Sequence, residues 1–291
     1  MSRHAEHQYL DLVRNILADG MVREGRNGST RAVFGATMRF PLAGNTLPLL
    51  TTKTIPWKIC LNELLWFMRG QTDNRILQDK GVKIWDGNAT RSFLDSRGLQ
   101  RNRTGDLGPI YGHQWRHFNA RYISCDHDYT GQGVDQLQNI ATALCDPALR
   151  TSRRLVMTAW NPCQIDDMAL PPCHALVQFS VDDQDGLSCA LYQRSGDVGL
   201  GVPFNIASYS MLTHILANHS GLHAKELVHF LGDAHIYEAH QGGLMLQARR
   251  SPTRFPRVTV RRRDNLCDYE VGDLKVTGYS PHPKIHLPMA A

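Results

Sequence analysis

Two strand-like runs joined by a short turn constrain the fold of this 291-residue chain more than any other segment. Residues 175–181 and 187–193 are rich in apolar and β-branched side chains, and residues 182–186 between them are turn formers. This pattern predicts an antiparallel hairpin. Further short strands are predicted over residues 155–160 and 257–262.

Four helices are predicted from apolar residues at three-and-four spacing. The apolar stripes lie within residues 9–17, 61–68, 134–144 and 206–216, and they end at Gly20, Gly70, Pro147 and Gly221. Helices and hairpins therefore alternate without a regular β-α-β order, which favours an α+β fold over a doubly wound sheet. We find no repeat and no linker, so residues 1–291 are expected to form a single domain with surface insertions at 86–105 and 119–133.

Composition excludes several classes of protein. Hydrophobic residues make up 42% and charged residues 20%, with Gly and Pro spread along the chain, which excludes collagen-like, disordered and low-complexity proteins. No apolar run approaches the ~18 residues of a membrane span, and the first residues lack the apolar core of a signal peptide. We therefore expect a cytoplasmic protein with no membrane partner.

Cysteine spacing and net charge narrow the chemistry. The seven cysteines have no paired spacing, so we expect free thiols and no metal site. A net charge of +5 fits either a basic solvated surface or a site for an anionic substrate. The run Arg261 to Arg263 is too short for a nucleic-acid patch and is assigned to the surface.

Three short segments carry candidate functional residues. Cys173 follows two prolines and precedes a strand, so a rigid turn aims either a nucleophile or a small buried side chain. Arg194 and Ser195 at a strand end suit a phosphate monoester, although Arg194 could instead pair with Asp197. Arg153 and Arg154 precede a strand, where adjacent side chains point to opposite faces. Either one of the pair leaves its sheet or both serve a neighbouring subunit.

These segments belong to a longer series of motifs. Pro-Pro-Cys-His-Ala at 171–175, Gln-Arg-Ser-Gly-Asp at 193–197, Val-Pro-Phe-Asn-Ile-Ala-Ser-Tyr at 202–209 and Gly-Asp-Ala-His-Ile-Tyr at 232–237 occur in this order, and the chain resembles thymidylate synthase. Similar matches extend over nearly the whole chain, and the two insertions resemble those of the eukaryotic and large-DNA-virus branch. The resemblance implies a mixed, largely antiparallel sheet covered by helices, with two copies packed sheet to sheet in an obligate homodimer.

The resemblance also implies the reaction. The family converts dUMP to dTMP with 5,10-methylenetetrahydrofolate as donor of both carbon and hydride, which leaves dihydrofolate. Cys173 is implied to be the nucleophile that adds to carbon 6 of uracil, with Arg194 as the cation that lowers the thiol pKa. Asn205 is implied to read uracil, because its amide both donates and accepts.

Further roles are implied residue by residue. Glu63, Tyr111, His174 and Asp197 are expected to take part in the chemistry. Arg26, Arg194 and Ser195 are expected to bind the phosphate together with Arg153 and Arg154 of the other subunit, and His235 and Tyr237 to bind the ribose. Residues expected to contact the folate are Lys53, Ile84, Trp85, Asn88, Asp197, Leu200, Gly201, Phe204 and Ala291. No metal is expected.

Several positions depart from the family pattern. The segment around Arg26 reads Gly-Arg-Asn-Gly-Ser instead of Asp-Arg-Thr-Gly-Thr, Thr54 and Pro56 follow the Thr-Thr-Lys motif, and the last residue is Ala291 rather than a larger aliphatic. A looser site admits water, so a dUMP 5-hydroxymethylase with the same nucleophile is an alternative. A non-catalytic nucleotide- or RNA-binding relative is a remote alternative, and RNA binding is not predicted.

Overall fold

The computed structural model describes residues 3–25 and 28–289 and is built on one six-stranded mixed sheet. Two expected site residues, Arg26 and Ala291, lie outside the described residues. The strands follow the order β1 (Met21–Gly25), β2 (Gly28–Pro41), β6 (His223–Tyr237), β5 (Gly186–Asp197), β4 (His174–Val181) and β3 (Val156–Thr158). All neighbouring pairs are antiparallel except β5 and β6. A separate antiparallel pair consists of β7 (Arg257–Val260) and β8 (Leu274–Thr277).

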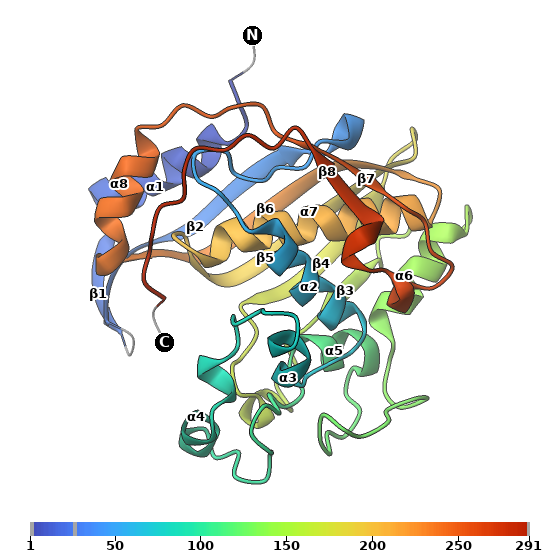
Figure 1. Ribbon diagram of the computed structural model, residues 1–291. Helices are drawn as coiled ribbons and strands as arrows, with labels where there is room; N and C mark the ends of the chain where they lie inside the picture. The colour runs from blue at the N-terminus through green and yellow to red at the C-terminus, as the bar shows by residue number, and fades with distance from the viewer. Residues whose placement is uncertain (1–2, 26–27, 290–291) are drawn as a thin grey trace.

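The parallel pair β5 and β6 is connected by helix α7 (Gly201–His219). Parallel strands need such a crossover, because a tight turn can only join antiparallel neighbours. Helix α7 is buried on almost every side, which explains why its sequence is apolar without a clear polar face. It lies across the sheet in Figure 1 and brings the turn after β5 into the candidate site.

The remaining helices surround α7 and one face of the sheet. They are α1 (His7–Asp19), α2 (Trp57–Met68), α3 (Asn74–Gln78), α4 (Arg91–Ser96), α5 (Tyr111–His117), α6 (Gln136–Cys145) and α8 (Gln241–Ala248). Short 3-10 turns occupy Ala43–Asn45, Gly87–Ala89, Ile165–Asp167, Glu238–His240, Leu266–Asp268 and Val271–Asp273. Figure 1 shows α1 and α8 beside β2, with α2, α3 and α5 below α7. None of the helices in the described ranges is long and apolar enough to cross a membrane.

The two faces of the large sheet differ in burial. On β4, β5 and β6 alternate residues such as Val177, Leu191 and Leu231 are buried beneath the helices. Their neighbours on the opposite face stay open: Leu176 is 38%, Tyr192 45% and Phe230 38% exposed. Tyr192 pairs with both Leu176 and Phe230, so these apolar side chains form a row across three adjacent strands.

The fold class is confirmed as α+β with a mixed, largely antiparallel sheet, and the four predicted helices and the 182–186 hairpin are present. Some predicted bounds were wrong: the third helix begins at Gln136, and the strand predicted over 155–160 covers only Val156–Thr158. Gly20 ends α1 in an extended conformation rather than a left-handed one. Glycine is needed there because a Cβ would lie 2.4 Å from the carbonyl oxygen of Ile16.

Periodicity missed three of the six strands of the large sheet, β1, β2 and β6. All five residues of β1 are exposed, and β2 contains the positive-φ residue Gly35 within a largely exposed stretch. In β6, three consecutive residues, Leu227, Val228 and His229, are buried, which breaks the alternation that identifies a strand.

Candidate active site

The turn before β4 holds Cys173 through its backbone. The Cys173 N–H donates to the hydroxyl of Tyr111 at 2.7 Å, and its carbonyl accepts from the backbone N–H of Arg194 at 2.8 Å. Because both bonds involve the backbone, the Cys173 thiol is left without a role in holding the turn. All seven cysteines are free, and Cys173 is half-buried.

The side chain of Arg194 is fixed beside this thiol. Its Nε and Nη2 donate to the carbonyls of Pro172 and Pro171 at 2.8 and 3.0 Å, and Nη2 lies 4.0 Å from Sγ of Cys173. The ring of Trp160 lies 5.2 Å from the guanidinium carbon, a cation–π arrangement. The two prolines, with φ fixed by their rings, thus hold the arginine as well as aiming the cysteine.

The charge of Arg194 lowers the pKa of the Cys173 thiol in the expected direction, but the net pKa in the free protein is not lowered. Burial raises the pKa of the thiol above its ordinary value, and the charge of Arg194 opposes this without overcoming it. Desolvation of the thiolate affects the Cys173 pKa more than the charge of Arg194 does, because this guanidinium is 4.0 Å from Sγ and is itself bonded to two carbonyls.

An aromatic cluster closes the site behind the cysteine. The ring of His174 stacks on Tyr111 with ring centroids 3.9 Å apart, and its Nδ1 hydrogen-bonds the hydroxyl of Tyr209 at 2.8 Å. Burial lowers the pKa of His174 to about 3, with a smaller contribution from His229, so the imidazole is neutral at pH 7. Tyr209 lies in one of the recognised motifs but was given no role by sequence reasoning.

Glu63, a titratable group, is hydrogen-bonded to Trp85. The indole N–H of Trp85 donates to Oε1 of Glu63 at 2.8 Å. Burial raises the pKa of Glu63 to about 7, and the bond from Trp85 partly offsets that effect. A carboxyl with this pKa both donates and accepts protons near neutrality.

Asp197 organises the turn between β5 and α7. Its Oδ1 accepts from the backbone N–H groups of Gly199 and Leu200 at 2.8 and 3.3 Å. Lys53, only 5% exposed, donates to the carbonyl of Gly199 at 2.5 Å, and burial lowers its pKa to about 8. Of the other residues expected to contact folate, Ile84, Leu200 and Phe204 are partly buried against the core.

A cavity of about 330 Å³ collects the expected phosphate and ribose residues Ser195, His235 and Tyr237. Among the lining residues that sequence reasoning missed are Arg23 and Asp233. The carboxylate of Asp233 accepts from Nδ1 of His235 at 2.9 Å and from Arg23 at 2.6 Å. Asp233 lies inside the Gly-Asp-Ala-His-Ile-Tyr motif, which was the one signal that could have found it.

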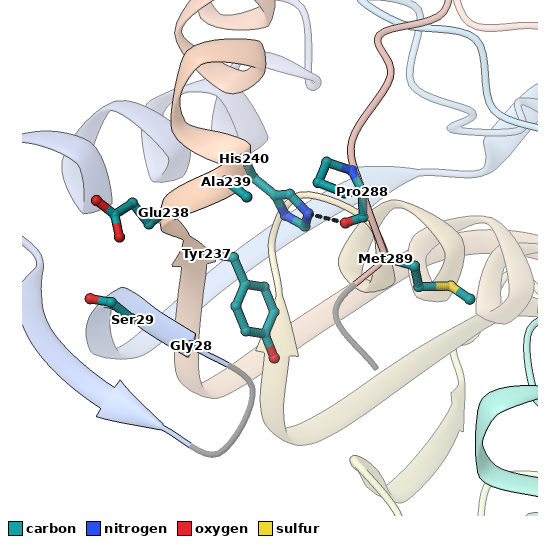
Figure 2. A pocket seen from close by; sticks show the side chains of 8 residues that line it. All are labelled: Gly28, Ser29, Tyr237, Glu238, Ala239, His240, Pro288 and Met289. Carbon is teal, nitrogen blue, oxygen red and sulfur yellow. Dashed lines mark hydrogen bonds between the residues drawn. The ribbon is translucent and has the colours of Figure 1, made fainter.

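A neighbouring cavity of about 500 Å³ shares Tyr237 with the first and reaches the C-terminal segment at Pro288 and Met289. Figure 2 shows Tyr237 and Met289 on opposite sides of this space. Asn205 lies in the first turns of α7, and its amide makes no hydrogen bond to another residue of the described ranges. Its donor and acceptor therefore remain available to a ligand.

Comparison with known proteins decides the family. A family model described as thymidylate synthase matches residues 7–291. The chain is 52% identical over 292 residues to the thymidylate synthase of Equine herpesvirus 2, with 100% of both chains covered.

The chain belongs to the thymidylate synthase family.

The chain is also 50% identical over 290 residues to the human thymidylate synthase, covering 99% of this chain and 91% of that one. The bifunctional dihydrofolate reductase-thymidylate synthase of Leishmania major is 53% identical over 291 residues, covering 99% of this chain and 55% of that protein. The chain thus spans about half the length of the bifunctional relatives.

Two residues expected in a thymidylate synthase phosphate site lie far from the Cys173 of the same chain. Arg153 and Arg154 are exposed and precede β3, where the carbonyl of Leu155 accepts from the backbone N–H of Phe179. Phe179 and Cys173 are six residues apart along β4, or about 20 Å at ~3.3 Å per residue. The two arginines therefore do not reach the Cys173 of their own chain.

One acidic cluster remains to be placed outside the thymidylate synthase motifs. Within the described ranges, the one group of side chains close enough to share a metal ion consists of Asp73, Cys125 and Asp126. The guanidinium of Arg103 already pairs with both carboxylates, at 2.8 Å from Asp73 and 2.7 Å from Asp126. Both carboxylates of the cluster are thus already ion-paired to an arginine that ties residues 86–105 to residues 119–133.

Proposed function

We propose that this protein catalyses the reductive methylation of dUMP to dTMP, with 5,10-methylenetetrahydrofolate as co-substrate and dihydrofolate as second product. The single observation that carries the proposal is the Cys173 turn, which presents a free thiol beside a fixed guanidinium. Membership of the thymidylate synthase family supports the same reaction.

Substrate binding uses the two ends of the site. In the proposal Arg194 and Ser195 bind the phosphate, together with Arg26 and a partner's Arg153 and Arg154. His235, oriented by Asp233, binds the ribose with Tyr237. The amide of Asn205 recognises uracil by donating to the carbonyl oxygen at position 4 and accepting from the N–H at ring position 3.

Covalent chemistry begins with Cys173. The thiol loses its proton and sulfur forms a bond to carbon 6 of uracil, so that carbon 5 becomes nucleophilic and attacks the methylene carbon supplied by the folate. Burial raises the pKa of this thiol and the charge of Arg194 opposes the rise, so in the proposal Arg194 favours the thiolate that attacks. After carbon 5 has lost its proton, the bond between the methylene carbon and the folate nitrogen breaks and tetrahydrofolate leaves. Hydride from this tetrahydrofolate converts the methylene to a methyl group as the C–S bond breaks, which leaves dTMP, dihydrofolate and the free thiolate.

Proton transfers are carried out by residues that are uncharged at pH 7 or have a pKa near 7. Glu63, with a pKa of about 7, serves the carbonyl oxygen at position 4 of uracil through water. Tyr111 and His174 are stacked and uncharged, and they relay protons around the base without placing a charge beside it. Trp85 fixes the Glu63 carboxyl through its indole N–H.

The proposal includes a homodimer. An open sheet face with Leu176, Tyr192 and Phe230 in one row favours packing against a second copy, since a row of exposed apolar side chains marks an interface. Arg153 and Arg154 would then reach the phosphate of the other subunit. The seven unpaired cysteines fit a reducing compartment such as the cytosol.

A covalent adduct tests the nucleophile directly. The wild-type protein incubated with 5-fluoro-dUMP and methylenetetrahydrofolate is expected to gain the mass of both, whereas Cys173→Ala should bind the nucleotide without forming the adduct. Cys163→Ala, which removes an exposed thiol, is the matched control and should form it. An adduct on the Cys173→Ala protein would overturn the assignment.

A further inference from the structure

His240 links two parts of the site that are distant in sequence. It ends the short turn Glu238–His240 between β6 and α8, and its side chain is 1% exposed. Its Nε2 hydrogen-bonds the carbonyl oxygen of Pro288 at 2.6 Å, as Figure 2 shows. Its Nδ1 lies 3.5 Å from Oδ1 of Asp197. The ring thus stands between the C-terminal segment and the turn that leads into α7.

Neither neutral form of this ring suits both neighbours. A carbonyl oxygen only accepts, so Nε2 must carry a proton. In the neutral ring Nδ1 is then a lone pair facing a carboxylate oxygen in a buried place, which is repulsive. Nδ1 has no hydrogen bond to any residue within the described ranges. Protonation of Nδ1 converts this repulsion into an ion pair.

The charges around His240 favour the imidazolium. Burial opposes protonation, but the Asp197 carboxylate 3.5 Å from Nδ1 and the hydrogen bond to the Pro288 carbonyl raise the His240 pKa above its ordinary value. Lys53, from the segment before α2, is the opposing cation. From β6 the ring of Tyr237 packs edge-on with centroids 5.5 Å apart. The exposed carboxylate of Glu238 lies two residues away in the same turn.

Gly199 shows how closely the ring is packed. A Cβ at residue 199 would lie 2.6 Å from Nδ1 of His240 and 3.1 Å from Oδ1 of Asp197. Only glycine leaves room for the imidazole and the carboxylate to approach there. The carbonyl of the same glycine accepts from Lys53. The approach of His240 to Asp197 therefore depends on the glycine in the turn between β5 and α7.

We propose that His240, as an imidazolium, is a positioning residue that joins Asp197 to the C-terminal segment, so that docking of this segment takes up a proton. The inference rests on the proposed function, in which Asp197 and the C-terminus contact the folate. Oδ1 of Asp197 is held by Gly199, Leu200 and His240, and Oδ2 has no hydrogen bond within the described ranges. His240 thereby keeps one oxygen of Asp197 available to the folate.

A titration of the wild-type protein tests the charge state without catalysis. Histidine labelled with ¹³C at Cε1 is followed by NMR against pH, and the His240 signal is assigned with His240→Gln. The expected midpoint lies above 6.5 in the full chain and falls when residues 288–291 are deleted. A midpoint at or below 6.5 in the full chain would overturn the proposal, whether or not the protein makes thymidylate.

Kinetics test the positioning role. In the wild type, the KM for methylenetetrahydrofolate should rise as pH increases through the His240 pKa, because the ion pair is lost. His240→Gln should raise this KM roughly tenfold at pH 6.5 and abolish its pH dependence, since one charge-assisted contact is removed. The KM for dUMP should stay unchanged. A folate KM that follows the wild type at each pH would contradict the role.

His214→Gln is the matched control. His214 is also buried and hydrogen-bonds a backbone carbonyl, that of Thr46 at 2.9 Å, but burial lowers its pKa and no carboxylate of the described part of the chain contributes to that pKa. The same substitution there should leave the folate KM and its pH profile as in the wild type. A change of equal size in both variants would show that general loosening, and not the ion pair, is responsible, and would overturn the proposal.

Discussion

The guanidinium of Arg194 lies 4.0 Å from Sγ of Cys173 and is held there by the carbonyl oxygens of Pro171 and Pro172. The cation is thus positioned by the same turn that positions the thiol. Because burial disfavours the thiolate, this nearby charge is what limits the rise of the Cys173 pKa. Arg194 accordingly serves the nucleophile before any nucleotide is bound.

Replacing this cation should make Cys173 less reactive. We expect Arg194→Gln to raise the thiol pKa further and to slow alkylation of Cys173 by iodoacetamide at pH 7 by about tenfold, since each pKa unit changes the thiolate fraction tenfold. Peptide mass mapping separates Cys173 from the exposed cysteines. Arg3→Gln, which removes an exposed ion pair with Asp11, should alkylate like the wild type. An unchanged rate for Arg194→Gln would contradict this role.

Ionisation of the buried Glu63 carboxyl is expected to lower the free energy of unfolding at alkaline pH. Its folded pKa of about 7 exceeds the ordinary glutamate value of 4.5, so the folded state holds a proton that the unfolded state releases. Stability therefore falls as pH rises from 4.5 to about 7 and stays lower above that range. Glu63→Gln should raise the Tm at pH 8 by on the order of a few degrees and much less at pH 5. Calorimetry at both values checks this, with Asp183→Asn in the exposed hairpin turn as control. Equal effects at both pH values would show that Glu63 is ionised throughout.

Asn205→Asp should change which base is accepted. An amide donates to O4 of uracil and accepts from N3–H, whereas a carboxylate only accepts and is repelled by O4. Toward cytosine the carboxylate accepts from the 4-amino group, and a proton shared with ring nitrogen 3 completes the pair. We expect kcat/KM for dUMP to fall by at least tenfold, as loss of a hydrogen bond to the base allows, while binding of dCMP improves. Competition between the two nucleotides measures the preference. An unchanged preference would mean that another residue reads the base.

Mixing two inactive variants tests the shared site. Arg154→Gln and Cys173→Ser should each be nearly inactive alone, but in a mixed dimer the Arg154→Gln subunit keeps its cysteine and receives an intact Arg154 from its partner. Unfolding and refolding an equal mixture should restore about a quarter of wild-type activity, because half of the dimers are mixed and each has one complete site. No recovery would show that Arg154 does not act across subunits.

The sequence predicted those features that are local. The hairpin at 182–186, the four helices and the proline-fixed cysteine turn all depend on residues close together in the chain, and motif order was enough to identify the family. Strand β6 escaped prediction because Leu227, Val228 and His229 are buried in succession, and that burial depends on elements distant in sequence, such as α1, that pack against β6.

Contacts between residues that are distant in the chain could not be predicted from the sequence. Arg23 reaches Asp233 across 210 residues, and His240 reaches Pro288 across 48. The rise of the Cys173 pKa by burial could not be predicted for a related reason, since burial of the thiol depends on the packed site and no neighbouring residue in the sequence reports it. Roles for Arg26 and Ala291 stay predictions, because both lie outside the described residues.

One assay shows directly whether this protein converts dUMP to dTMP. Purified protein is incubated with dUMP and 5,10-methylenetetrahydrofolate while the absorbance of dihydrofolate is followed and the nucleotide product is identified by mass. The account predicts dTMP and dihydrofolate in equal amounts, with none from Cys173→Ala. The formation of 5-hydroxymethyl-dUMP without dihydrofolate would contradict it and favour the hydroxymethylase, and the absence of any product from a folded, dUMP-binding dimer would contradict it in favour of a non-catalytic role.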